Sequence, residues 1–203
     1  MTKANIKIAP SSVINYGGLD CIVLDVEQNK ILVLAKKSIG DMPFDEGNGN
    51  NFPNSTLCKY LNGEFIKKLK ANGADTSALI PTTIDLTSDN GLKDYVGETT
   101  QKVFLLTCNM YRKYRSVIPN LDDWWWLATA YSNESNGCAL SARSVSSDGS
   151  LSINYARISN YGVRPAFYLK SSVLGSLPHS LSEFTTEELL KEVLRRNAKK
   201  TDE

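Results

Sequence analysis

The chain has 203 residues, a formal net charge of +1 and 41% hydrophobic residues, which is an ordinary globular composition. This length suits one domain, or one domain with an appendage, and it supports a core that needs no metal or disulfide. The balanced charge gives no electrostatic reason to expect nucleic acid or an anionic membrane as a partner.

Cysteine and histidine are too sparse to predict a metal centre. The four cysteines, Cys21, Cys58, Cys108 and Cys138, are widely spaced, and His179 is the only histidine. With no CxxC pair and no Cys/His cluster, we expect no zinc site and no cofactor. Cys21 and Cys108 lie inside apolar runs and are expected to be buried thiols.

Targeting signals are not recognisable in the sequence. The opening stretch MTKANIKIAPSS lacks the apolar core of a signal peptide, and no segment approaches the roughly 18 apolar residues of a membrane span. We therefore expect a cytoplasmic or virion-associated protein without a signal peptide or a membrane span.

The first predicted elements are two strands and a helix. Two apolar runs, residues 21–26 and 31–36, are joined by a connection of hairpin length. After a loop over residues 39–54, a helix is predicted to begin at the N-cap Ser55 and to end at Asn72 and Gly73. Apolar residues recur every four positions in this helix and predict its buried stripe, which consists of Leu57, Leu61, Phe65 and Leu69.

The middle of the chain gives mixed signals. A short helix is expected near Leu92, and residues 103–107, VFLLT, predict a strand. Residues 111–115 predict a short helix or an edge strand. The interpretation that we favour for them is a solvated face with tyrosines packed beneath it, and the alternative is a patch that binds phosphate or carboxylate.

A charged helix is predicted in the C-terminal region. Thr185 and Glu188 form a capping box, which marks the start of a helix. This helix could dock on its own domain, self-associate or bind a partner, and the first of these is favoured.

Residues 144–154 predict a polar hairpin. A three-residue loop over residues 147–149, with Gly149 in the left-handed position, sets Val145 opposite Leu151 and Ser146 opposite Ser150. Val145, Leu151 and Ile153 then face one way, and the opposite face is predicted to carry Ser144, Ser146, Ser150, Ser152 and Asn154. We expect the apolar face to be the underside and the hydroxyl-rich face to point outward.

Three consecutive tryptophans precede this hairpin. In a strand, Trp124 and Trp126 share one face and Trp125 lies on the other. We expect at least two of them to be buried.

The last apolar block, GVRPAFYL, predicts a strand that is entered at Gly162. Pro165 predicts an edge position or a bulge, because proline cannot donate to a sheet. Arg164 lies between apolar residues and predicts a buried ion pair, with Asp122 or Asp123 as its partner.

These motifs carry a resemblance that covers residues 20–169. An apolar hairpin, an SxLxxYLN helix, KVFLLT, WWWLATAYS and NYGVRPAFYLK follow one another. The order resembles phage and gut-bacterial proteins with WWLRS-type and GVRPA-type blocks. The resemblance implies the C-type lectin-like fold of the formylglycine-generating enzyme superfamily and of the variable proteins of diversity-generating retroelements.

In such retroelements, miscopied adenines diversify codons near the 3′ end of the gene, and Asn codons drift toward Ser, Tyr, Asp and Gly. The resemblance therefore implies that the contact residues lie in the Ser-, Asn- and Tyr-rich segment 131–161. The candidate ligand-binding residues are Tyr131, Asn133, Ser135, Asn136, Ser144, Ser146, Asn154, Tyr155, Arg157, Ser159, Asn160 and Tyr161.

Catalysis and calcium binding are not expected. The formylglycine-generating reaction needs a pair of reactive cysteines in one site, whereas these cysteines lie in unrelated contexts. No GxSxG motif surrounds a serine, and GNGNN lacks the lysine of a phosphate-binding loop. The EPN-, QPD- and WND-type runs of calcium-binding lectins are absent as well.

The sequence thus predicts an α+β, C-type lectin-like protein with short antiparallel strands, two or more helices and much irregular loop. An N-terminal extension (1–19) precedes the domain (20–175), and a linker with a charged C-terminal helix (176–203) follows it. The predicted function is non-catalytic binding of a protein or glycan, and the helix is a possible site of self-association. A phage structural or scaffold subunit is the alternative, and a formylglycine-generating-type enzyme is a more distant one.

Overall fold

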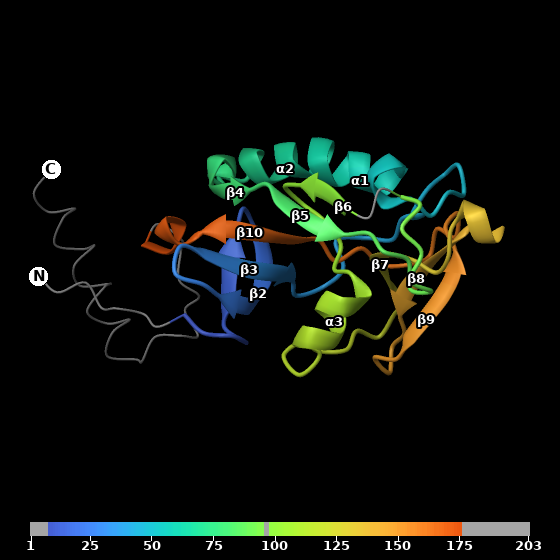
Figure 1. Ribbon diagram of the computed structural model, residues 1–203. Helices are drawn as coiled ribbons and strands as arrows, with labels where there is room; N and C mark the ends of the chain where they lie inside the picture. Colours follow the sequence, from blue (N-terminus) through green and yellow to red (C-terminus); the bar gives the residue numbers. More distant parts are fainter. Residues whose placement is uncertain (1–7, 96–97, 176–203) are drawn as a thin grey trace, which may run out of the picture.

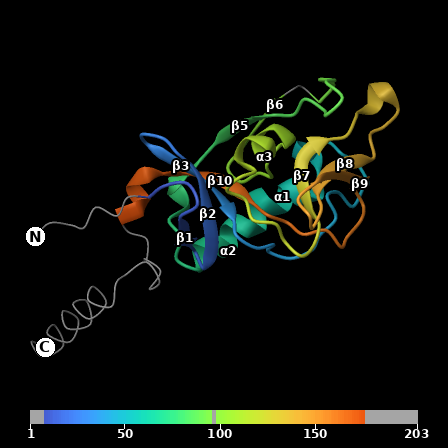
Figure 2. The same cartoon turned by 90° about the horizontal axis from the view of Figure 1, so that it is seen from below.

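The computed structural model describes residues 8–95 and 98–175. It is an α+β fold built mainly from antiparallel sheets around one hydrophobic core. A five-stranded and a three-stranded sheet lie toward opposite ends of the domain in both views (Figures 1 and 2). The predicted C-terminal helix and His179 lie outside the described residues. Among the described residues, no helix is both long and apolar enough to cross a membrane.

The five-stranded sheet has the strand order β1-β2-β3-β10-β4. Its strands are β1 (Val13–Tyr16), β2 (Leu19–Val26), β3 (Lys30–Ala35), β10 (Ala166–Lys170) and β4 (Leu79–Ile80). The predicted hairpin is confirmed, since β2 pairs antiparallel with β3. The predicted domain boundary at residue 20 falls inside this sheet, because β1 pairs with β2. The domain therefore includes residues that were expected in an N-terminal extension.

One helical segment covers the core on one side (Figure 1). It runs through α1 (Thr56–Tyr60), the π-helical turn η2 (Leu61–Phe65) and α2 (Ile66–Ala71). The Ser55 side chain accepts the N–H of Cys58, and the helix ends at the C-cap Asn72, as predicted. The four residues of the predicted apolar stripe are all buried. Four 3-10 turns are also present: η1 (Phe52–Asn54), η3 (Thr76–Ala78), η4 (Glu134–Asn136) and η5 (Ser171–Gly175).

The middle of the chain differs from the prediction. The helix expected near Leu92 is absent from the described residues, and a small hairpin of β5 (Thr82–Asp85) and β6 (Glu98–Gln101) brackets that region instead. Residues 103–107 are buried but form no regular strand, because Phe104 pairs only with Ala166, and Leu106 accepts the N–H of Ala128. This segment therefore connects the two sheets.

Helix α3 (Cys108–Tyr114) follows, on the side of the domain opposite α1 and α2 (Figure 1). Tyr111 and Tyr114 are buried, whereas Arg112 and Lys113 are exposed. The favoured interpretation, tyrosines packed beneath a solvated face, is therefore confirmed.

The three-stranded sheet contains β7 (Trp125–Ala130), β8 (Ser141–Val145) and β9 (Leu151–Tyr155). The predicted register is confirmed, with Val145 opposite Leu151 and Gly149 at a φ of +84°. Trp125 and Trp126 are buried, which agrees with the expectation that at least two tryptophans are.

The aromatic contacts also confirm the predicted alternation of the tryptophans. Trp124 and Trp126 both contact the Tyr161 ring, whereas Trp125 packs against Tyr111 on the other face.

Arg164 is fully buried, as predicted, but Asp122 and Asp123 are exposed and do not bind it. Its guanidinium donates to the main-chain carbonyls of Ala35 (3.0 Å), Lys36 (3.2 Å) and Pro119 (3.2 Å). It also lies over the Trp125 ring, 4.8 Å from the ring centroid. Burial lowers the pKa of Arg164 to about 10, which still leaves it charged at neutral pH. The predicted carboxylate is not needed because the end of β3 presents free carbonyls here.

Pro165 lies directly before β10, which is a central strand and pairs with β3 without a register shift, so neither the predicted edge position nor the predicted bulge is found here. The missing N–H causes no loss at this position, while the carbonyl of Pro165 accepts the N–H of Ala35. Residues 162–165 instead link the two sheets, since Gly162 exchanges main-chain hydrogen bonds with Trp124 and Trp126.

The contacts of Arg164 predict that lysine cannot replace it. Arg164→Lys keeps the charge, but an ammonium group lacks the planar guanidinium that donates hydrogen bonds to the three carbonyls. We therefore expect a loss of about 2–4 kcal/mol in the free energy of unfolding. Urea denaturation measures this loss. Arg157→Lys, at an exposed position, is the control and should stay within about 0.5 kcal/mol of the wild type. Equal stability of the two variants would show that the hydrogen bonds of the Arg164 guanidinium do not stabilise the fold.

Candidate functional site

The hydroxyl-rich face of the β8–β9 hairpin is buried at Ser144 and Ser146, contrary to prediction, and half-buried at Ser152 and Asn154, so that only Ser150 at the turn is exposed. Ser144 is fully buried and pairs with Trp126 of β7 and with Ser152 of β9. Tyr161 stacks on Trp126, with ring centroids 4.4 Å apart, and its hydroxyl accepts a hydrogen bond from Asn154. The small serines leave room for these rings, so this polar face is covered by aromatic packing.

The structure separates the predicted contact residues into two groups. Four are buried and therefore cannot contact a ligand on the surface: Asn133, Ser144, Ser146 and Tyr161. Asn154 is half-buried, and the exposed ones are Tyr131, Ser135, Asn136, Tyr155, Arg157, Ser159 and Asn160. The prediction of ligand contacts is corrected for the first group and stays a prediction for the others.

The opposite face of the hairpin carries the exposed side chains. Arg143 of β8 pairs with Ile153 of β9, and Tyr155 lies two residues further along the same face of β9. The Arg143 guanidinium lies over the ring of Tyr131, 5.3 Å from its centroid. We call Tyr131, Arg143, Ile153 and Tyr155 the outer face. Its exposed fractions are 39% for Tyr131, 39% for Ile153 and 52% for Tyr155.

Sequence reasoning missed two residues of the outer face, Arg143 and Ile153. The predicted register already placed Ile153 beside Val145 and Leu151. At that end of the hairpin Val145 is buried, and the Gly149 carbonyl accepts the hydroxyl of Tyr111. Beyond the reach of α3, the same row of side chains is exposed. The signal for Ile153 and Arg143 was thus in the alternation of the strands.

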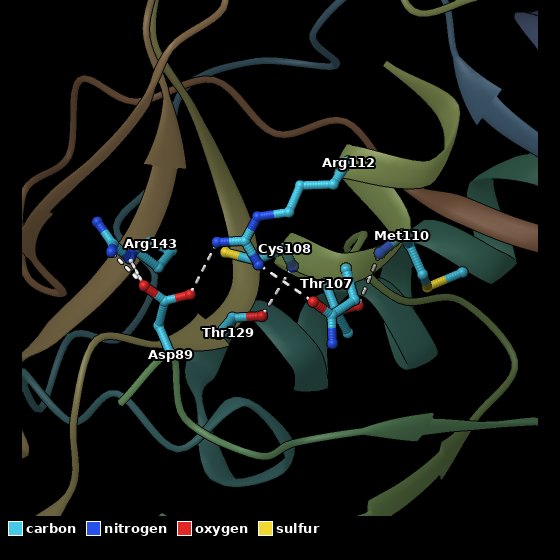
Figure 3. A network of polar contacts seen from close by, with 8 residues as sticks. Asp89, Thr107, Cys108, Met110, Arg112, Thr129 and Arg143 are labelled. Atoms are coloured by element: carbon cyan, nitrogen blue, oxygen red, sulfur yellow. Dashed lines mark hydrogen bonds and ion pairs between the residues drawn. The ribbon is translucent and has the colours of Figure 1, made fainter. Parts of the chain in front are cut away.

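A polar network holds Arg143 in place (Figure 3). Asp89 accepts hydrogen bonds from Nε and Nη2 of Arg143 on one oxygen, and from Arg112 at 3.1 Å on the other. Arg112 also donates to Asn109 at the start of α3, at 3.1 Å. Burial alone would raise the pKa of Asp89, but the hydrogen bonds from Arg143 and Arg112 outweigh it and keep this pKa below its usual value.

A polar cavity of about 220 Å³ opens beside this network. The residues that line it include Asp85, Asp89, Thr107, Asn109, Arg112 and Thr129. Thr107 is the N-cap of α3, and Thr129 accepts the N–H of Cys108. The cavity therefore lies where β7, α3 and the segment after β5 meet.

Buried Asn50 holds the 131–141 loop, which leads from β7 to β8. Its amide nitrogen donates to the carbonyls of Ser132 (2.8 Å), Cys138 (3.1 Å) and Ser141 (2.8 Å). Its side-chain oxygen accepts the hydroxyl of Tyr95 at 2.6 Å. One amide thus fixes both ends of a segment that has little regular structure.

The thiols of Cys21, Cys58 and Cys108 are buried, as expected for Cys21 and Cys108. Burial is the main cause that raises the pKa of Cys58 and of Cys108 to about 11, and it also raises that of Cys21. These three thiols therefore stay protonated and weakly nucleophilic at neutral pH. Across residues 8–95 and 98–175, no group of three His, Cys, Asp or Glu side chains is placed to hold a metal ion.

Comparisons with known proteins give a family match. A family model described as a domain of unknown function (DUF6273) matches residues 28–111 and 107–171. Neither the curated proteins nor the solved structures contain a match to this chain. The matched residues include every strand except β1 and β2, and they include the outer face and the cavity.

The lowered pKa of Asp89 predicts a pH-dependent contribution to stability. A carboxyl with a lowered folded-state pKa stabilises the fold above its unfolded value of about 3.9, and this stabilisation is lost as pH falls through the folded value. Asp89→Asn should therefore lower the free energy of unfolding by about 1–3 kcal/mol at pH 7, and the difference should shrink below about pH 4. Urea denaturation across this range measures it. The exposed Asp122→Asn should change stability at pH 7 by less than about 0.5 kcal/mol. A constant difference for Asp89→Asn down to about pH 2 would contradict the assignment.

The contacts of Asn50 predict that an isosteric acid disrupts the loop. Asn50→Asp removes both N–H donors and places carboxylate oxygens against three carbonyls, so we expect a loss of about 3 kcal/mol or more. Hydrogen exchange should show faster exchange at the amides of residues 131–141 than in the wild type. Asn160→Asp, at an exposed position, is the matched control. Unchanged exchange in Asn50→Asp would show that the loop is held by other contacts.

Proposed function

The chain belongs to the DUF6273 family, and we propose that it is a non-catalytic ligand-binding module that contacts its ligand with the outer face. The observation that carries the proposal is the exposure of two tyrosines and an isoleucine beside Arg143 on one face of a small sheet. Exposed aromatic and arginine side chains gathered in one place are typical of residues that dominate binding energy.

The outer face is organised before any ligand arrives. Asp89 fixes the guanidinium of Arg143 with hydrogen bonds to two of its nitrogens, and that guanidinium in turn lies over the Tyr131 ring. Arg157 lies over the Tyr155 ring in the same way, 5.8 Å from its centroid. Side chains that are ordered in the free protein lose little entropy on binding, which favours affinity.

The scaffold in this proposal is C-type lectin-like, and the ligand is a protein or a glycan. The support is the resemblance carried by WWWLATAYS and GVRPAFYLK, together with a mixed fold of short antiparallel strands. Within the same proposal, the chain is a variable protein of a diversity-generating retroelement. Its diversified contacts are the exposed candidates Tyr131, Ser135, Asn136, Tyr155, Arg157, Ser159 and Asn160. A neighbouring near-repeat of codons 124–165 that differs only at adenines would support this part, and its absence beside a sequenced gene would count against it.

The absence of catalysis is also part of the proposal. The raised pKa values of Cys21, Cys58 and Cys108 support it, because these thiols are poor nucleophiles at neutral pH.

The proposal predicts that ligands selected against the full chain converge on the outer face. Peptides from a displayed library and glycans from a printed array serve as probes, and biolayer interferometry gives their Kd. Tyr155→Ala and Ile153→Ser should each weaken selected binders by about 10-fold or more. Because both side chains are exposed, the melting temperature should stay within about 2 °C of the wild type.

The control is Val26→Ser, since Val26 is also an exposed apolar side chain but lies on β2 of the other sheet. It should leave binding unchanged. Binders that are indifferent to Tyr155→Ala and Ile153→Ser would refute the proposal. A stable oligomer of the full chain that Tyr155→Ala and Ile153→Ser dissociate would refute it in favour of a phage structural or scaffold subunit.

A further inference from the structure

The polar cavity beside the outer face has the properties of a small binding site. Its volume of about 220 Å³ is below the roughly 300–1,000 Å³ of pockets for drug-sized ligands, so it suits a single ring rather than a chain of rings. Asp89 lies in its wall and binds Arg143 of the outer face. Any ligand in the cavity would therefore lie next to the surface that the proposed function uses.

The charges around the cavity cancel. Asp85 and Asp89 supply two carboxylates, and Arg112 and Arg143 supply two guanidinium groups. Asp89 is already paired with both arginines, which leaves Asp85 and the exposed side of Arg112 as opposite charges in the wall. This balance disfavours an anion as well as a cation, because each would meet a like charge.

The wall offers both hydrogen-bond donors and acceptors. Thr107 accepts the N–H of Met110, so its own O–H remains available as a donor. Asn109 accepts from Arg112 through its oxygen, which leaves its NH₂ group as a second donor. On the acceptor side, Thr87 binds only one oxygen of Asp85, and the other can accept. Donors and acceptors that are mixed in one neutral cavity suit groups that both donate and accept.

We propose that this cavity binds one ring of a neutral polyhydroxylated ligand, of the hexose class. Each hydroxyl of such a ring donates one hydrogen bond and accepts others, which matches the mixed wall. The ring also has apolar C–H faces, and the exposed ring of Tyr131 contacts the same Arg143 guanidinium that Asp89 binds. A longer saccharide would extend from the cavity across Tyr131 onto the outer face.

This inference rests on the proposed binding function, but the two can fail separately. A protein ligand on the outer face with no sugar in the cavity would refute only the inference. Glucose, galactose, mannose and N-acetylglucosamine, each as a free monosaccharide, are the probes, and acetate ion is the charged comparison.

Saturation-transfer NMR with the full chain should detect millimolar binding of at least one of these sugars and none of acetate. Asn109→Trp should abolish the signal, because Asn109 lines the cavity from an exposed position on α3 and the larger indole would occupy space that the sugar needs. Asn109→Ala, which removes only the side-chain amide, should weaken the affinity by about 3-fold or more.

Lys113→Trp is the matched control, since Lys113 is also exposed on α3 but contacts Asp25 instead of the cavity. It should leave sugar binding unchanged, and the melting temperatures of all three variants show whether they are folded. The inference is refuted if no sugar gives a signal, if acetate binds and the sugars do not, or if sugar binding survives in folded Asn109→Trp.

Discussion

The two sheets are held in their relative positions by the buried guanidinium of Arg164. It binds carbonyls at the end of β3 and at Pro119, and it lies over Trp125 at the start of β7. The five-stranded sheet, the 115–120 loop and the three-stranded sheet therefore meet at one side chain. A buried cation is tolerated because its donors have acceptors and an aromatic ring faces it. Arg164 lies in segment 162–165, which links the three-stranded sheet to the five-stranded sheet. This segment is therefore the junction between the two sheets.

The outer face exists because this junction fixes how the three-stranded sheet is covered. One side of that sheet packs beneath Tyr161 and the segment around Met42, whose carbonyl accepts the Trp126 indole N–H. The other side is covered by α3 only near Trp125 and Val145, and it is open from Arg143 to Tyr155. Partial coverage by one short helix thus produces both the exposed surface and, where α3 begins, the cavity.

Features that depend on neighbouring residues could be predicted from the sequence. The β2–β3 hairpin, the Ser55 cap, the stripe from Leu57 to Leu69 and the Val145–Leu151 register each follow from local spacing. The orientation of the β8–β9 hairpin could not be predicted in this way, because it depends on where Tyr161 packs, and tertiary packing overrides the polarity of small residues such as Ser144. The hydrogen-bond partners of Arg164 and Asn50 could not be predicted either, because they are main-chain carbonyls, which all residue types share.

Asn50 has a consequence for how the 131–141 loop can evolve. The side-chain amide of Asn50 donates hydrogen bonds to this loop only at main-chain carbonyls, which every residue type possesses. Substitutions at Ser135 or Asn136 therefore leave these three bonds intact, while they remove only the side-chain bonds of Ser135 to Asn133 and of Asn136 to Ser132. Exposed side chains of this loop can therefore differ without breaking the bonds that Asn50 makes to its backbone.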